Sequence, residues 1–211
     1  MEDVKCSKEA AGVHAARFDS RHRAPYYRPP ATATLPMPAH GRNAGDDRPA
    51  FDQRQFRDAL AQFPTGVTIV CTREPSGRYV GFTANSFNSV SLDPPLILWT
   101  IARRSASLAS FEAAGRYAVN VLSSDQADLA RSFSRPHTDR FAGVAHRLGW
   151  SDAPLIDGCV AWLECRHHGR HAIGDHVVFV GEVVTVERAR GQALIFHQGR
   201  FTATESPTDA R

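Results

Sequence analysis

The chain has 211 residues, 42% of them apolar, and a formal net charge of only +3, so it can bury the core of one domain. The small charge and the scattered basic residues argue against a nucleic-acid-binding protein, and no window approaches the roughly eighteen apolar residues of a membrane-spanning helix. Residues 1–30 lack the apolar centre of a secretory signal and no CxxC pair occurs, which predicts a cytoplasmic protein with reduced, half-buried thiols at Cys6, Cys71, Cys159 and Cys165.

Residues 1–50 differ in composition from the rest of the chain. They contain six of the thirteen prolines, together with Arg, His, Ala and Gly, and they show no apolar periodicity. Such a segment cannot bury enough apolar surface to offset the conformational entropy lost on ordering. We therefore expect a disordered N-terminal tail over residues 1–50, a folded domain over residues 51–204 and a flexible C-terminus over residues 205–211.

A helix followed by a hairpin opens the predicted domain. Asp52 can cap the start of the helix, and Pro64 ends it. The run 67–72 predicts a strand, and the turn 75–77 joins it to a second strand beginning at Tyr79. The apolar positions that recur near helical spacing are Phe51, Phe56, Leu60 and Phe63.

Residues 81–92 form an extended segment filled with Thr, Asn and Ser, where a structural strand would alternate apolar and polar residues. Asn is unfavourable in strands, so Asn85 and Asn88 suggest specific partners for their amides. The segment is either an ordinary exposed strand or the lining of a site for a flat ligand with polar edges. In a single strand, one face would carry Thr83, Asn85, Phe87 and Ser89 and the other Ser86, Asn88 and Val90.

Beyond the apolar strand predicted over residues 96–101, helices are inserted singly between strands. Helices are expected over 105–114 and 125–133, the second capped by Ser123 or Ser124, and residues 134–158 resemble a loop. Further strands are expected over 117–122, 159–168, 176–187 and 193–197. Because strands dominate and the GxGxxG of a Rossmann fold is absent, the pattern predicts a mainly β fold, an antiparallel barrel with inserted helices.

Two short segments between elements could contribute to a binding site. In residues 63–67, Gly66 lets the backbone approach a planar group and Thr65 offers a hydroxyl, although a simple helix stop explains the same residues. In residues 102–108, free backbone N–H groups, the hydroxyls of Ser105 and Ser107 and the guanidinium groups of Arg103 and Arg104 could bind an anion. The second segment is equally consistent with a capped helix that carries surface arginines.

A histidine is the best candidate for a catalytic side chain. Asp175 can orient His176 through one ring nitrogen and leave the other for a ligand, although an exposed turn histidine is the simpler interpretation. The nearby His167, His168 and His171 lack Cys or carboxylate partners at ligand spacing, so no metal site is expected. No GxSxG elbow supports a nucleophilic serine.

Several ordered segments together resemble the short-chain flavin reductases. These enzymes are the reductase components of two-component flavin-dependent monooxygenases, similar to the reductase component of 4-hydroxyphenylacetate 3-monooxygenase. The resemblance covers about residues 52–203 and rests on residues 63–67, 81–87, 89–96, 141–144, 174–176 and 181–183.

The resemblance implies a split β-barrel of the FMN-binding type that forms a homodimer and binds flavin at the subunit interface. Thr65 and Gly66 would lie against the isoalloxazine ring, and Thr83, Asn85 and Ser86 would contact the ring edge, ribityl chain or phosphate. Ser91, Arg103 and Ser107 would hold the phosphate end. His176 would stand at the nicotinamide site as the catalytic residue, with Arg140, Phe141 and Phe201 nearby.

Hydride transfer needs two flat rings stacked about 3–3.5 Å apart, with no metal and no strong acid or base from the protein. In agreement with this requirement, the resemblance implies an NAD(P)H-dependent flavin reductase that uses NADH or NADPH, with NADH preferred, reduces FMN in slight preference to FAD, and supplies reduced flavin to a partner monooxygenase. Three alternatives stay open: a non-catalytic flavin-binding electron-transfer or storage module, a relative of the pyridoxamine-phosphate oxidases, and an FMN oxidase with its own organic substrate.

Overall fold

The computed structural model describes residues 16–17, 51–135 and 139–203. Apart from the two-residue strand β1 (Ala16–Arg17), the predicted N-terminal tail lies outside the described residues, as do Cys6 and the predicted C-terminus. Within the described ranges, no helix is long and apolar enough to cross a membrane.

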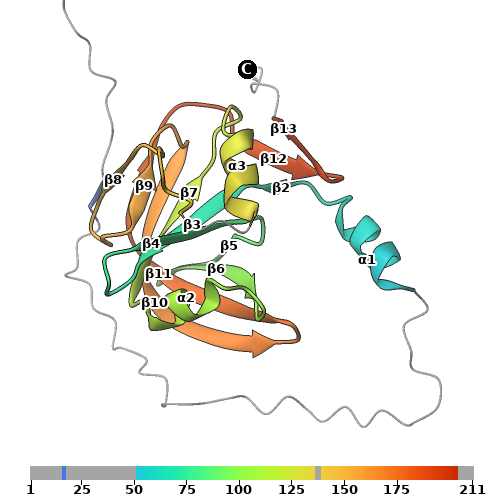
Figure 1. Ribbon diagram of the computed structural model, residues 1–211, viewed down its shortest axis with the longest axis horizontal. Helices are drawn as coiled ribbons and strands as arrows, with labels where there is room; N and C mark the ends of the chain where they lie inside the picture. The colour runs from blue at the N-terminus through green and yellow to red at the C-terminus, as the bar shows by residue number, and fades with distance from the viewer. Residues whose placement is uncertain (1–15, 18–50, 136–138, 204–211) are drawn as a thin grey trace, which may run out of the picture.

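The described strands form one large antiparallel sheet and two small ones (Figure 1). In the small sheets, β2 (Thr65–Gly66) pairs with β12 (Leu194–His197), which pairs with β13 (Arg200–Ala203), and β8 (His146–Leu148) pairs with β9 (Pro154–Ile156). In the large sheet, β1 pairs with β11, and the strand order is β4 (Tyr79–Ala84), β3 (Thr68–Arg73), β7 (Arg116–Val121), β10 (Ala161–Ile173), β11 (His176–Arg188), β6 (Pro95–Ala102) and β5 (Asn88–Leu92).

Helices α1 (Gln53–Leu60), α2 (Leu108–Ala113) and α3 (Ala127–Ser134) are inserted singly between strands. The prediction of a mainly β, antiparallel fold with inserted helices is therefore confirmed. The N-terminus of α1 is also as predicted, because the Asp52 carboxylate accepts a hydrogen bond from the Gln55 N–H at 2.7 Å.

The large sheet curls, so that β4 at one edge approaches β6 near the other. The rings of Phe82 and Trp99 lie 5.6 Å apart, and the Ser86 hydroxyl accepts a hydrogen bond from the Thr100 N–H at 2.9 Å. Among the described strands, no backbone ladder joins β4 to β5 or β6. The sheet is therefore strongly curved but is not a closed barrel.

The inside of the curl is an aromatic core. Trp99 and Phe179 stack with ring centroids 4.4 Å apart and planes 2° from parallel, and Phe111 of α2 packs edge-on against Trp99 at 5.0 Å. Full burial of each such ring contributes roughly 1.5–3 kcal/mol. A second core cluster, which includes Phe133 of α3, lies around Ile69, Leu155 and Leu194. The two clusters fix α2 and α3 against the sheet.

The polar segment predicted as one strand is interrupted. Strand β4 ends at Ala84 and β5 begins only at Asn88, so the predicted alternation of residues 83–90 between two faces is wrong. The reason is tertiary, because the Ser86 hydroxyl is bonded to the backbone of β6, which draws the chain out of strand geometry.

Three other sequence expectations need correction. Helix α2 begins at Leu108 and not at residue 105. Helix α3 has Gln126 at its N-cap position with no capping side-chain bond, because the Ser123 hydroxyl donates to Asp125 instead. The predicted loop 134–158 contains the short strands β8 and β9.

A close approach across the large sheet requires Gly181. A Cβ at this position would collide with the hydroxyl of Tyr117 and lie 3.1 Å from the Cβ of Cys165. We expect Gly181→Ala to lower the free energy of unfolding by about 1–3 kcal/mol, measured by urea denaturation. The matched control is Gly169→Ala on the adjacent strand, where a Cβ meets no atom within 4 Å. An equal loss in both variants would contradict this assignment.

Candidate functional site

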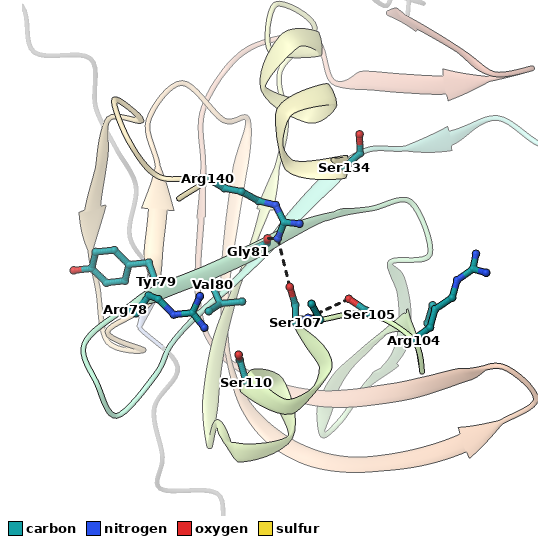
Figure 2. Close-up of a pocket in the computed structure, with 12 residues that line it drawn as sticks. Arg78, Tyr79, Val80, Gly81, Arg104, Ser105, Ser107, Ser110, Ser134 and Arg140 are labelled. Carbon is teal, nitrogen blue, oxygen red and sulfur yellow. Dashed lines mark hydrogen bonds between the residues drawn. The ribbon is translucent and has the colours of Figure 1, made fainter. Parts of the chain in front are cut away.

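A pocket of about 670 Å³ lies between β4 and the turn that leads into α2 (Figure 2). Its polar lining contains three arginines and four serines: Arg78, Arg104, Arg140, Ser105, Ser107, Ser110 and Ser134. Guanidinium and hydroxyl groups are donors, so this lining suits an anionic ligand.

Arg140 is held across the pocket by hydrogen bonds to the main chain. Its Nε donates to the Arg135 carbonyl at 3.0 Å and its Nη1 to the Gly81 carbonyl at 2.9 Å. Nη1 also donates to the buried Ser107 hydroxyl at 3.4 Å. Partial burial lowers the pKa of Arg140, but a guanidinium stays charged at neutral pH. Arg140 is therefore a fixed positive charge beside Ser107, as Figure 2 shows.

The turn over residues 102–108 offers the pocket side-chain hydroxyls, because most of its backbone N–H groups are already hydrogen-bonded. The backbone N–H groups of Arg103 and Ser105 donate to the carbonyls of Asp175 and Ala102 at 2.9 Å each. The predicted set of free N–H groups at this turn is therefore wrong, because the turn satisfies most of them itself. Ser105 Oγ accepts from the Ser107 N–H at 3.3 Å, and both hydroxyls keep a proton to donate to an anion.

His176 lies next to this turn. It is opposite Ala102, a pocket-lining residue, in the ladder between β11 and β6. Its Nδ1 is 2.8 Å from Asp175 Oδ1, and the hydrogen bond from His176 lowers the pKa of Asp175. With the proton on Nδ1, Nε2 is the free acceptor nitrogen. The predicted pairing of Asp175 with His176 is confirmed.

Thr65, Gly66 and Phe201 come together in the small sheet β13–β12–β2. Thr65 is opposite Phe196, whose ring centroid lies 5.4 Å from that of Phe201. The Thr65 hydroxyl is buried and has no hydrogen-bond partner among the described residues. A Cβ built on Gly66 meets no atom within 4 Å. A polar atom that needs a partner thus lies beside an open stretch of backbone.

The polar side chains predicted to contact the flavin from residues 83–91 differ in whether they are already bonded within the protein. The Thr83 hydroxyl donates to the Ala130 carbonyl at 2.7 Å, and the Ser86 hydroxyl is bonded to Thr100. Both hydroxyls therefore have acceptor capacity but no spare proton for a ligand. Asn85 is exposed in the connection between β4 and β5, and Ser91 lies on β5.

Helix α3 contacts three of the predicted site residues: Thr83, Phe201 and Phe141. Its Ala130 carbonyl accepts from Thr83, and its Arg131 guanidinium lies 5.2 Å from the centre of the Phe201 ring. The Phe133 ring packs edge-on against Phe141 at 5.0 Å. Phe141 is only 8% exposed, so it supports Arg140 from the core and does not present its ring to the pocket.

Three of the arginine and serine side chains that line the pocket were not predicted as site residues from the sequence: Arg78, Ser110 and Ser134. Ser110 follows Ser107 by about one helical turn, so spacing alone could have indicated it. Nothing local distinguishes Arg78 or Ser134, because each reaches the pocket only through the packing of α2 and α3 against the sheet.

The cysteines and the histidine cluster offer no second reactive centre. Cys71, Cys159 and Cys165 are free and buried. Burial raises the pKa of Cys159 to about 12 and the pKa of the other two thiols as well, which keeps them protonated. Across residues 51–135 and 139–203, no cluster of three His, Cys, Asp or Glu side chains could hold a metal ion.

Comparison with known proteins gives a consistent result. The family model "Flavin reductase like domain" matches residues 60–205. A probable flavin reductase of Rhizobium meliloti is 44% identical over 151 residues, which cover 72% of this chain and 49% of that protein. The reductase component of the flavin-dependent trigonelline monooxygenase of Acinetobacter baylyi is 41% identical over 157 residues, which cover 74% of this chain and 51% of that protein. The chain thus spans about half the length of both relatives.

Among solved structures, the NADH:FAD oxidoreductase SgcE6 of Streptomyces globisporus, in complex with NAD and FAD fragments, is similar over almost its whole length. It is 41% identical with a TM-score of 0.71, over 76% of this chain and 96% of that chain.

Proposed function

Since this chain belongs to the family with the flavin reductase like domain, we propose that it is an NAD(P)H-dependent flavin reductase. It takes a hydride from reduced nicotinamide, passes it to FMN or FAD, and releases the reduced flavin to a partner monooxygenase. The relatives named for NADH:FAD oxidoreduction and for a monooxygenase reductase component support this assignment.

The observation that carries the proposal is the pocket beside β4. Ser105 and Ser107 offer donor hydroxyls, and Arg140 offers a positive charge, to one phosphate-sized group at the level of Gly81. Charge-assisted hydrogen bonds of this kind bind phosphate strongly. The acceptor oxygen of Thr83 lies farther along the same strand, and Asn85 directly follows the end of that strand.

The open backbone at Gly66 and the unpartnered Thr65 hydroxyl fit the isoalloxazine ring. A flat ring can lie against a residue without a side chain, and its polar edge can satisfy the buried hydroxyl. The bound flavin supplies the redox chemistry. The chain contributes binding and orientation, which is the main catalytic requirement for hydride transfer.

His176 is assigned to the nicotinamide site, because it lies one ladder position from the pocket and its free ring nitrogen can bind the carboxamide. His176→Ala should raise the KM for NADH about tenfold, and the KM for flavin less than about twofold. The control is His171→Ala, an exposed histidine on the adjacent strand β10. Equal effects on both Michaelis constants would refute the assignment.

The finer features of the fold and assembly are part of the same proposal. The curled sheet, with Ser86 bonded across to Thr100, supports a split β-barrel of the FMN-binding type. Helix α1 has no buried residue and stands away from the body of the molecule in Figure 1. Its apolar side chains support a homodimer in which a second copy covers them.

A steady-state assay tests the proposed activity. The purified chain should oxidise NADH only when FMN or FAD is added, and the rate should saturate in both substrates. NADH oxidation that does not depend on added flavin, or no oxidation at all, would refute the reductase assignment.

A further inference from the structure

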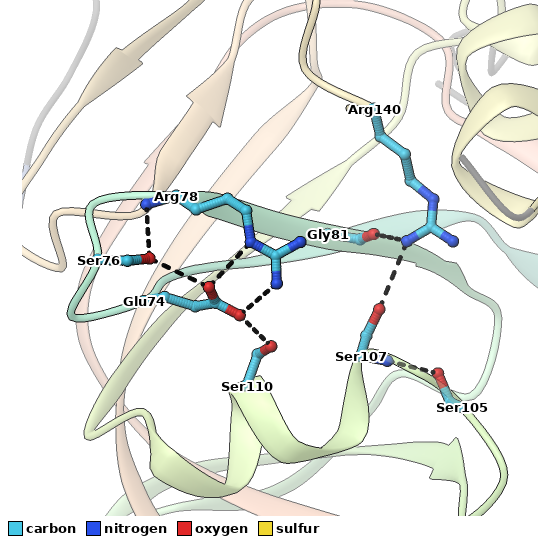
Figure 3. Close-up of polar contacts among 8 residues, drawn as sticks. All are labelled: Glu74, Ser76, Arg78, Gly81, Ser105, Ser107, Ser110 and Arg140. Atoms are coloured by element: carbon cyan, nitrogen blue, oxygen red, sulfur yellow. Dashed lines mark hydrogen bonds and ion pairs between the residues drawn. The ribbon is translucent and has the colours of Figure 1, made fainter. Parts of the chain in front are cut away.

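The pocket extends beyond the group of Ser105, Ser107 and Arg140 that is assigned to one phosphate. It continues along β4 from Gly81 to Arg78, at the end of the hairpin between β3 and β4. A strand rises about 3.3 Å per residue, so the Cα of Arg78 lies about 10 Å from that of Gly81. The long Arg78 side chain covers part of this distance, because it extends back toward Gly81 and Arg140 (Figure 3). In the proposed function the phosphate of FMN lies near Gly81, so the Arg78 end of the pocket is left for a longer ligand.

Arg78 is held in place by a carboxylate. Its Nε and Nη2 donate to the two oxygens of Glu74 at 2.9 and 2.6 Å. The Ser110 hydroxyl of α2 donates to the same carboxylate at 2.6 Å. The pKa of Glu74 falls to about 2, because Arg78 and then Ser110 donate to its oxygens. The carboxylate is therefore ionised at neutral pH and fixes the plane of the guanidinium.

The ion pair with Glu74 uses Nε and Nη2 of Arg78 and leaves its other terminal nitrogen directed toward the pocket. Figure 3 shows the second terminal nitrogen, Nη1, pointing away from Glu74 and toward the side of the pocket where Gly81 and Arg140 lie. The Arg78 side chain is 62% exposed. An arginine held by a two-bond ion pair has already lost its rotamer freedom, so it binds a further anion at little additional entropic cost.

We propose that Arg78, positioned by Glu74, binds the second phosphate of FAD and makes FAD the preferred flavin of this chain. The inference rests on the proposed function and adds the flavin that the pocket selects. FMN ends at its single phosphate and cannot reach Arg78, whereas the diphosphate of FAD continues along β4 toward it. Arg78 is thus a specificity residue and takes no part in hydride transfer.

Binding without turnover tests this assignment. Dissociation constants of FAD and FMN are measured by quenching of flavin fluorescence with the full chain and no nicotinamide. The unchanged chain should bind FAD at least about fivefold more tightly than FMN. Arg78→Gln should weaken FAD about tenfold and FMN less than about twofold. Arg78→Lys, which keeps the charge but loses the two-bond geometry, should give an intermediate FAD affinity.

The matched control is Arg73→Gln, at an exposed position on the other strand of the same hairpin, which should change neither affinity. Equal losses for FAD and FMN in Arg78→Gln, or no loss for FAD, would overturn the role of Arg78. If the unchanged chain binds neither flavin, the proposed function itself fails, so the two failures are distinguishable. If Arg78→Gln does not fold, the FAD-to-FMN ratio of Arg78→Lys decides the question.

Discussion

Replacing Gly66 with leucine should lower kcat/KM for flavin at least about 100-fold while leaving the thermal unfolding temperature unchanged. The fold leaves room at this position, because a Cβ built on Gly66 meets no atom of the described chain within 4 Å. The bound ring does not tolerate it, since leucine would fill the space beside Thr65 that we assign to the isoalloxazine. Displacement of a reacting ring by about 1 Å is enough for a loss of this size.

Gly115→Leu is the matched control for this prediction. Gly115 is exposed, follows α2, and likewise has no atom within 4 Å of a built Cβ. Its leucine variant should retain both activity and stability. If Gly66→Leu keeps the reductase activity of the unchanged chain, the ring does not lie against this backbone.

The second prediction concerns the exposed apolar side chains on α1 and beside its two ends. Phe51, Phe56, Leu60 and Phe63 are 52%, 50%, 57% and 74% exposed. Just after α1, Gln198 donates hydrogen bonds to the Ala61 carbonyl and the Gln62 side chain, which tie the end of the helix to the body. A helix of eight residues is marginal by itself in water, and an exposed apolar face of this kind marks an interface.

The double variant Phe56→Gln with Leu60→Gln should therefore convert a dimer into a monomer in sedimentation velocity. In a symmetric dimer it removes four apolar side chains, at about 1.5–3 kcal/mol each, so the dissociation constant should rise by more than about 10⁴-fold. The control Arg54→Gln alters an exposed residue of the same helix, whose side chain is 90% exposed, and should leave the assembly intact. A monomeric unchanged chain, or a double variant that stays dimeric, would contradict the homodimer proposal.

The elements that the sequence predicted well have local causes. Asp52 caps α1 through its own side chain, and the turn over residues 75–77 defines the β3–β4 hairpin. Strand β11 was predicted to within one residue. Strand β10 was predicted to end at His168 but continues to Ile173, because its far end contains Gly169, Arg170 and His171 and lacks an apolar alternation. A polar strand end of this kind gives no hydrophobic pattern in the sequence, because it forms only by pairing with the adjacent strand.

The site was predicted only where a motif carries the information locally. The pairing of Asp175 with His176 depends on adjacent residues, so the sequence could indicate it. The bond from Arg140 to Gly81 joins residues 59 positions apart, and the break in the polar segment depends on Ser86 reaching Thr100. Neither contact has a signal in the local sequence, because each arises from the curl of the large sheet.

The most direct test of the account is the anaerobic reaction of the chain with equal amounts of NADH and FAD, followed by ultrafiltration through a membrane that retains the protein. We predict that the visible absorbance of oxidised flavin disappears, that one NADH is consumed per flavin, and that the bleached flavin passes into the filtrate. Flavin that keeps its colour with NADH unconsumed, or that stays with the protein after slow reduction, would contradict the account and indicate a flavin-holding module instead.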